Sequence, residues 1–144
     1  MIILSCKTNM EAAMLIKTFI IVAVVSAAIY VLYLNGYITV QNKKALMFVG
    51  KNGFIDKHCY AKFSACTGRL KKVIKFKETK EYTFTLDCKL EKGEVKVTLC
   101  DPDKNTVFIL TPDNTSAVVD AKYGRYYMEI EIYKAYGSYD ISWK

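Results

Sequence analysis

Histidine is almost absent from this chain, which has a single one, His58, in 144 residues. No recognised catalytic or cofactor-binding motif occurs either. Acid–base and nucleophilic catalysis depend on reactive side chains, such as histidine, that converge on one site. The five cysteines include no C-x-x-C pair. Cys59 follows His58 directly, so the two side chains would face opposite sides of a strand. We therefore expect no enzymatic activity, no cofactor, no zinc site and no Cys/His nucleophile pair.

A calcium-binding loop is also lacking, although one stretch begins like one. Residues 101 to 105 read Asp-Pro-Asp-Lys-Asn, which matches the first ligand positions of a calcium loop. That loop needs glycine at its sixth position and glutamate at its twelfth, where this chain has Thr106 and Pro112. Asp, Pro and Asn also favour hairpin turns, so the stretch predicts a plain turn and no metal site.

Apolar residues are plentiful, and they are concentrated near the amino end. They make up 52% of the chain, beside 24% charged residues. Residues 18 to 34 carry no charge, and three apolar residues extend the run past Lys17. Roughly 20 apolar residues suffice for a helix to cross a membrane, and Tyr30, Tyr33 and Tyr37 stand where an aromatic belt is expected. The run is too uniformly apolar for a core helix with a solvent face, so it predicts a transmembrane segment at 14–37.

We expect this segment to remain attached as a signal anchor. Val25-Ser26-Ala27 has small residues at the spacing that a signal peptidase reads, but seven more apolar positions follow Ala27, unlike most cleaved signals. No cysteine comes directly after the run, which argues against a lipid anchor. Positive charges are nearly balanced around the span, and the short amino segment favours an amino terminus inside and an exported carboxyl-terminal domain. Met10 and Met14 are alternative starts, in which case part or all of residues 1–13 is not translated.

Beyond residue 37 the apolar pattern changes from a helical to an alternating one. Alternation with a period of two runs through residues 70–76, 82–90, 95–99, 126–132 and 139–143, and residues 106–110 form a short apolar run. Turn residues separate these stretches at Lys92-Gly93, Asp101-Pro102-Asp103, Pro112-Asp113-Asn114, Tyr123-Gly124 and Tyr136-Gly137. This pattern predicts a linker at 38–44 and an all-β domain at 45–144, an antiparallel two-sheet β-sandwich of about eight strands.

The end of the chain carries a resemblance to a known family. Residues 124–127 (Gly-Arg-Tyr-Tyr) and residues 135–143 (Ala-Tyr-Gly-Ser-Tyr-Asp-Ile-Ser-Trp) resemble the last strands of bacterial pre-peptidase C-terminal domains. Residues 59–63, 67–68, 91–94 and 101–103 resemble parts of small uncharacterised extracytoplasmic β-sandwich proteins of Gram-positive bacteria. The resemblance covers residues 48–144 and implies an exported sandwich with an accessory or binding role and no catalysis. Unlike the family pattern, the sandwich is expected here to follow a membrane segment, with no protease attached.

Four cysteines lie in the expected domain, and Cys6 precedes the span. Cys59, Cys66, Cys88 and Cys100 allow three disulfide pairings in an exported domain, and the sequence does not choose among them. The alternative is that they are small buried apolar residues, as cysteine often is.

Lysine and arginine crowd into one segment of the domain. Residues 57–80 hold eight of them against Glu78 alone, in a chain whose net charge is +7. A basic binding face is expected if they project from one side of a sheet; its candidate residues are Lys62, Arg69, Lys71, Lys72, Lys75 and Lys77. The alternative is a solvated strand face, or lysines that guard a sheet edge against aggregation. Nucleic acid fits poorly, because the aromatic residues alternate inward and the domain is expected to be exported.

These features predict a single-pass cell-membrane protein with an extracytoplasmic β-sandwich that has a non-catalytic binding or structural role in the envelope. The alternative function is binding of carbohydrate or an anionic cell-wall polymer through the basic face. The expected partners are therefore the membrane and a wall polymer, a carbohydrate or another envelope protein.

Overall fold

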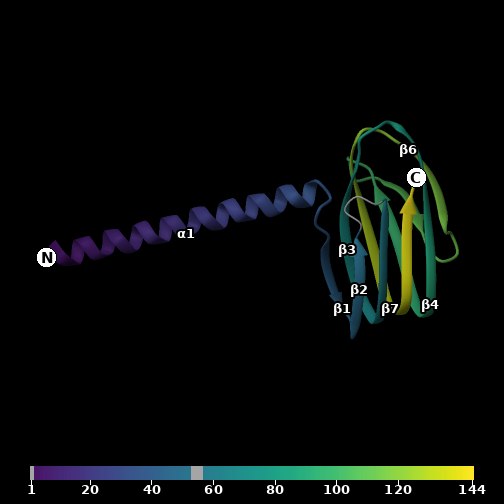
Figure 1. Cartoon of the computed structure of the whole chain (residues 1–144), viewed down its shortest axis with the longest axis horizontal. Coiled ribbons are helices and arrows are strands. Elements are labelled where there is room, and N and C mark those ends of the chain that lie inside the picture. The colour runs from purple at the N-terminus through teal and green to yellow at the C-terminus, as the bar shows by residue number, and fades with distance from the viewer. Residues whose placement is uncertain (1, 53–56) are drawn as a thin grey trace. The chain divides into compact units, whose positions relative to one another are not determined.

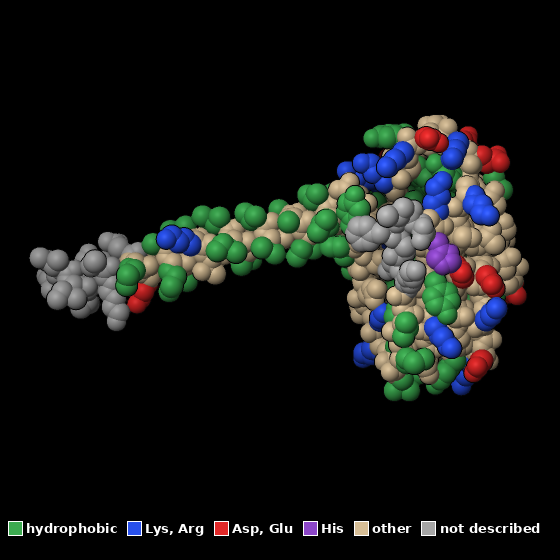
Figure 2. Space-filling view, in the orientation of Figure 1, with side chains coloured by type: hydrophobic (Ala, Val, Ile, Leu, Met, Phe, Trp, Pro, Cys, Tyr) green, Lys and Arg blue, Asp and Glu red, His purple; other side chains and the backbone are tan. Residues whose placement is uncertain are grey.

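The computed structural model describes residues 2–52 and 57–144, and it divides the chain into two compact units, residues 1–32 and 33–144. Helix α1 (Ile2–Leu34) makes up the described part of the first unit and ends two residues beyond it; its residues 10–34 are long and apolar enough to span a membrane. Figure 2 shows hydrophobic side chains along this part of the helix. The hydroxyls of Thr18 and Ser26 donate to the carbonyls of Met14 and Val22, at 2.9 and 2.8 Å, so these polar groups are satisfied within the helix.

The second unit is antiparallel β-sheet (Figure 1). Its strands are β1 (Val40–Lys44), β2 (Met47–Asn52), β3 (His58–Phe76), β4 (Lys80–Cys100), β5 (Thr106–Leu110), β6 (Ser116–Ala121) and β7 (Gly124–Trp143). The path through the sheet is β1-β3-β7-β4-β5, with β2 also on β3 and β6 also on β4. β3, β7 and β4 are about 20 residues long and form the centre of the sheet.

The three long strands bend at the same level, and this bend makes two layers. The register shifts between Phe63 and Gly68 in β3 and between Leu90 and Glu94 in β4, and both irregularities face residues 132–137 of β7. β2 and β6 pair only with the halves of β3 and β4 on one side of the bend, and β1 and β5 only with the other halves. Bulges of this kind fold a sheet over on itself, so each long strand contributes to both layers of a sandwich.

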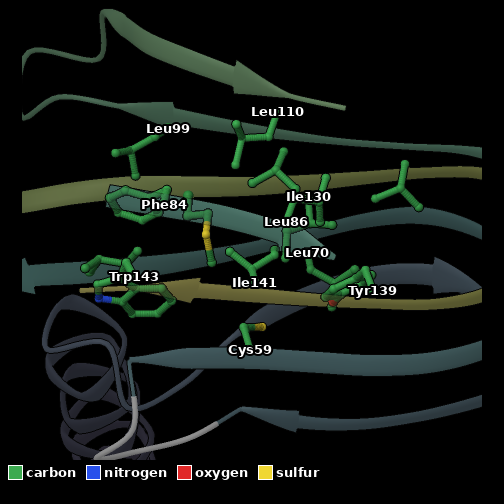
Figure 3. Packing of buried hydrophobic residues seen from close by; sticks show 14 of the residues in the cluster. Cys59, Leu70, Phe84, Leu86, Leu99, Leu110, Ile130, Tyr139, Ile141 and Trp143 are labelled. Atoms are coloured by element: carbon green, nitrogen blue, oxygen red, sulfur yellow. The ribbon is translucent and has the colours of Figure 1, made fainter. Parts of the chain in front are cut away.

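Aromatic side chains pack between the layers. Phe84 is fully buried and lies 5.0 Å from the ring of Phe108 in the other layer and 5.6 Å from Trp143 in its own. Phe76 contacts Tyr82 at a ring distance of 4.4 Å. Figure 3 shows Phe84, Leu86, Leu99, Ile141 and Trp143 gathered in this cluster, which forms one continuous core. Rings of this size bury large apolar areas and stabilise a domain of this length.

The predicted all-β sandwich behind an apolar helix is therefore confirmed, with differences in detail. Lys92-Gly93 and Tyr136-Gly137 are not turns between strands; they lie inside β4 and β7, at the bend. A turn and a bulge use the same residue types, because both need backbone conformations that glycine adopts easily. The linker expected at 38–44 also differs from the structure, since residues 40–44 form β1 and pair with β3.

Candidate functional site: a lysine-lined cleft

A cleft of about 750 Å³ opens at one end of the sandwich unit. It lies where the carboxyl-terminal half of β3, the start of β4 and the end of β7 meet residues 35–37. We call it the lysine cleft; its wall includes Asn35, Gly36, Tyr37, Lys57, Lys72, Lys75, Lys77, Glu78, Lys80, Tyr82 and Trp143. Five lysines and one glutamate give it a strongly positive lining.

Lys72 is the innermost of these charges. It belongs to the inward-facing series of β3, between the buried residues Leu70 and Ile74, and is only 8% exposed. Its ammonium lies 5.9 Å above the ring of Trp143. Within the described residues, no carboxylate forms an ion pair with it. Burying a charge is costly unless an opposite charge compensates it, so this ammonium is suited to an anion that enters the cleft.

Two further lysines converge on one ring at the mouth of the cleft. The ammoniums of Lys57 and Lys80 lie 5.4 and 5.1 Å from the ring centre of Tyr82. The backbone fixes Lys57, because its carbonyl accepts a hydrogen bond from the Trp143 amide at 3.0 Å. Glu78 is the acidic residue in the lining, and it pairs with Lys80 at 3.4 Å. Both ammoniums add positive potential at the mouth of the cleft, and this potential favours an anion there.

The third side of the cleft is the segment directly after the helix. Gly36 has a φ of +77°, and a side chain at this position would clash with the backbone carbonyl of Val73. Its amide donates to the carbonyl of Tyr33 at 2.9 Å, as in a helix carboxyl-terminal cap. Only glycine fits both the backbone angle and the close approach, so Gly36 holds this wall against β3.

The structure separates the six residues of the predicted basic face. Lys72, Lys75 and Lys77 line the cleft, whereas Lys62 is exposed in the other half of β3. Arg69 and Lys71 lie beside β7, where they form ion pairs with Glu129 at 3.4 and 3.6 Å. Figure 2 shows acidic side chains interspersed among the basic ones on the visible face of the sandwich. Of the six residues, three therefore line the cleft, two lie beside a glutamate of β7, and Lys62 is exposed in the other half of β3.

Sequence reasoning included Lys57 and Lys80 in the basic segment but not among the binding residues, and it missed Tyr82 and Trp143. Trp143 ends β7, far from residues 57–82 in the sequence, and only the strand order brings it to them. One signal was present: Lys72 interrupts the apolar side of an alternating strand, where a lysine needs a special environment.

The four domain cysteines, all in the described part of the chain, form no disulfide. Cys59 and Cys66 lie on β3, and Cys88 and Cys100 lie on β4. β7 separates these strands, so within a layer their backbones are about 9–10 Å apart. A disulfide needs Cα atoms closer than about 7 Å, which excludes a bond between a β3 cysteine and a β4 cysteine of the same layer.

Burial makes three of these thiols, those of Cys59, Cys66 and Cys88, poor nucleophiles. It raises the pKa of Cys59 and Cys66, and it raises that of Cys88 to about 11, with the nearby Asp87 charge adding to the effect. His58 pairs with Asp140 at 3.0 Å and is partly exposed, while Cys59 is buried. The two neighbours therefore face opposite sides of β3, as expected from the alternation of a strand.

The Asp-Pro-Asp stretch forms the predicted turn. One carboxylate oxygen of Asp101 accepts the Asn105 amide at 2.8 Å, and the Asp101 carbonyl accepts the Lys104 amide at 2.9 Å. The Asp101 side chain therefore stabilises the turn. Across residues 2–52 and 57–144, no group of three or more His, Cys, Asp and Glu side chains could hold a metal ion.

No protein-family model and no curated protein matches the chain. Some solved structures show a limited likeness. One is the enzymatically active domain of bacteriophage CBA120 tailspike protein 4, with a TM-score of 0.43, 10% identity, and coverage of 76% of this chain and 19% of that one. Another is the carbohydrate binding module CBM6cm-2 from Cellvibrio mixtus lichenase 5A, with a TM-score of 0.40, 10% identity, and coverage of 74% and 92%. A family 35 carbohydrate binding module from Clostridium thermocellum has a TM-score of 0.37 and 8% identity, over 72% and 97%. Likenesses this distant assign no family.

Proposed function

We propose that this protein is a non-catalytic binding module of the bacterial envelope, held to the cell membrane by α1, with its sandwich on the extracytoplasmic side. Its ligand is an anionic envelope molecule, such as a phosphate-bearing wall polymer, and it enters the lysine cleft. The span and the lack of charge in residues 18–34 support the anchor. The resemblance of residues 48–144 to exported sandwich modules supports the compartment.

The observation that carries this proposal is Lys72. A buried ammonium without a carboxylate partner among the described residues destabilises the empty domain, and a domain with a structural role alone gains nothing from it. Four more lysines line the same cleft. A phosphate or carboxylate group accepts hydrogen bonds from several ammoniums at once, and such charge-assisted bonds are the strong ones.

A neutral sugar fits this cleft less well. Neutral sugars stack on exposed aromatic faces, but Tyr82 and Trp143 are 4% and 7% exposed and are covered by the core and by lysines, which leaves Tyr37 as the exposed ring of the lining. A carbohydrate ligand would therefore be recognised by its anionic substituents. This favours the polymer version of the predicted function over recognition of an uncharged glycan.

Binding of a soluble phosphate polymer tests the proposal. Trp143 is the only tryptophan of the chain and lies in the cleft, so its emission reports occupancy. Full-length protein in phosphatidylcholine nanodiscs is titrated with polyglycerol phosphate and with an uncharged glycan of similar length. We expect a saturable change with the phosphate polymer, weakened by salt, and none with the uncharged glycan.

Matched variants locate the binding. Lys72→Met removes the inner charge, and Lys62→Met removes an exposed charge in the other half of the same strand. We expect Lys72→Met to weaken binding about 10- to 100-fold and Lys62→Met to change it little. Equal response to the uncharged glycan, or unchanged binding by Lys72→Met, contradicts the proposal. Protection of the domain from protease added to intact cells contradicts its extracytoplasmic side.

A further inference from the structure

Covalent geometry keeps the lysine cleft close to the end of α1. Asn35, Gly36 and Tyr37 line the cleft, and they follow Leu34, the last helical residue. An extended chain covers at most about 3.5 Å per residue, so Tyr37 lies within roughly 10 Å of the helix end. If the helix spans the membrane up to Leu34, residues 35–37 of the cleft wall therefore lie within about 10 Å of the membrane surface.

Tyr37 belongs both to the cleft and to the end of the apolar run. It is half-exposed, it lines the cleft, and it is the last of three tyrosines at this end of the apolar run. Tyrosines in such positions sit at the level of the lipid headgroups. Gly36 holds the same segment against β3, so the cleft cannot separate from this region without breaking that contact.

We infer that the lysine cleft binds the phosphate of an anionic lipid headgroup in the membrane that α1 crosses. This inference rests on the proposed function for the membrane span and for an anionic ligand. Lipid headgroups carry the phosphates nearest to residues 35–37, and headgroups with a net negative charge attract nearby lysines with about 1 kcal/mol for each charge. The cleft of about 750 Å³ admits a headgroup but not a folded macromolecule.

Lys72 distinguishes this site from general attraction between lysines and a membrane. Solvated lysines act on the membrane surface without any defined contact. Lys72 is buried beneath the cleft mouth beside Trp143, and it adds to binding only when a phosphate enters. Dependence on Lys72, with the outer lysines intact, is therefore the signature of a headgroup site.

The experiment compares nanodiscs of pure phosphatidylcholine with nanodiscs in which about one lipid in four is phosphatidylglycerol, a fraction that gives a negative surface. The full-length wild type, Lys72→Met and Lys62→Met are each reconstituted in both. Trp143 emission is recorded without soluble ligand, and polyglycerol phosphate is then titrated. Soluble glycerol 3-phosphate is a separate arm that supplies the same chemistry without a membrane.

We expect phosphatidylglycerol to change Trp143 emission in the wild type and in Lys62→Met but not in Lys72→Met. It should also weaken polymer binding by about tenfold, because the headgroup occupies the cleft. No emission change in the wild type, or the same change in Lys72→Met, overturns the inference. If the polymer still binds in neutral nanodiscs, the proposed function stands and only the assignment of the phosphate to a lipid is wrong. If nothing binds in any arm, the inference and the proposed function both fail. A response to glycerol 3-phosphate but not to phosphatidylglycerol assigns the cleft to a soluble ligand and likewise overturns the lipid source.

Discussion

The ammonium of Lys72 lies 5.9 Å above the ring of Trp143, and both side chains are more than nine-tenths buried. Lys72 comes from β3, and Trp143 is the last residue of β7. The ring attracts the cation through its π electrons, but this contact offsets only part of the cost of burying a charge. We therefore expect the pair to lower the stability of the empty domain.

Lys72→Met should stabilise the domain. Methionine has a similar length, fills the same space and needs no compensation for a buried charge, so we expect unfolding to cost about 1–2 kcal/mol more. Urea denaturation of the full-length protein in neutral detergent measures this difference. Lys71→Met is the control, because Lys71 is exposed and has only a 3.6 Å ion pair with Glu129; its effect should be within about 0.5 kcal/mol of zero. A loss of stability in Lys72→Met would show that the empty cleft already compensates the charge.

Gly93 should be essential to the bend in β4. It has a φ of +89°, and a side chain there would clash with the backbone of Lys134 and Ala135 in β7. Gly93→Ala should therefore destabilise the domain by about 2–3 kcal/mol, through both strain and steric overlap. Gly50→Ala is the control, since Gly50 has no left-handed φ and the nearest atom is the ring edge of Phe48. The two free energies of unfolding are compared by denaturation, and equal effects would contradict the role assigned to the bend.

The alternating pattern predicted the sandwich because half of each strand faces the core. Tyr82, Phe84 and Leu86 are buried in β4 as their spacing required. The bend could not be predicted, because Gly93 looks the same in a turn and in a bulge. Only pairing with β7 shows that the chain continues through it.

The cleft could not be predicted from the sequence for a related reason. Lys72 and Lys75 were both candidates for a basic face, yet one points inward and the other is exposed. They share a site because the sheet ends there and residues 35–37 close it. Nothing local to β3 indicates where its edge lies. The charge of Arg69, by contrast, is neutralised by Glu129 and Glu131, which face it only through the register of β7.

The buried cysteines should react slowly while the domain is folded. Burial raises the pKa of Cys59, Cys66 and Cys88, so near pH 8 very little thiolate is present, and the first two are also shielded from reagents. Alkylation with iodoacetamide, followed by peptide mass analysis, should modify Cys59 and Cys66 at least about a hundredfold faster after unfolding in guanidinium. Similar rates before and after unfolding would mean that the bend in β3 opens readily.

Glu131 should make stability fall in acid. Its carboxylate accepts a hydrogen bond from Lys96 at 2.7 Å and lies 3.2 Å from Arg69, and these contacts lower its pKa below 4.5, with the Lys96 hydrogen bond as the main cause. A group whose pKa is lower in the folded state stabilises the protein above its unfolded pKa. That contribution disappears as pH falls through the folded pKa. The free energy of unfolding should therefore decrease as the pH falls below about 4.5. Glu131 is partly exposed, so its share of that decrease should be less than about 1 kcal/mol. Glu131→Gln should remove that share of the decrease, and Asp113→Asn, in an exposed turn, should leave it unchanged. Denaturation curves recorded from neutral to acid pH compare the three proteins; a Glu131→Gln curve that parallels the wild type would show that the Lys96 contact is lost in solution.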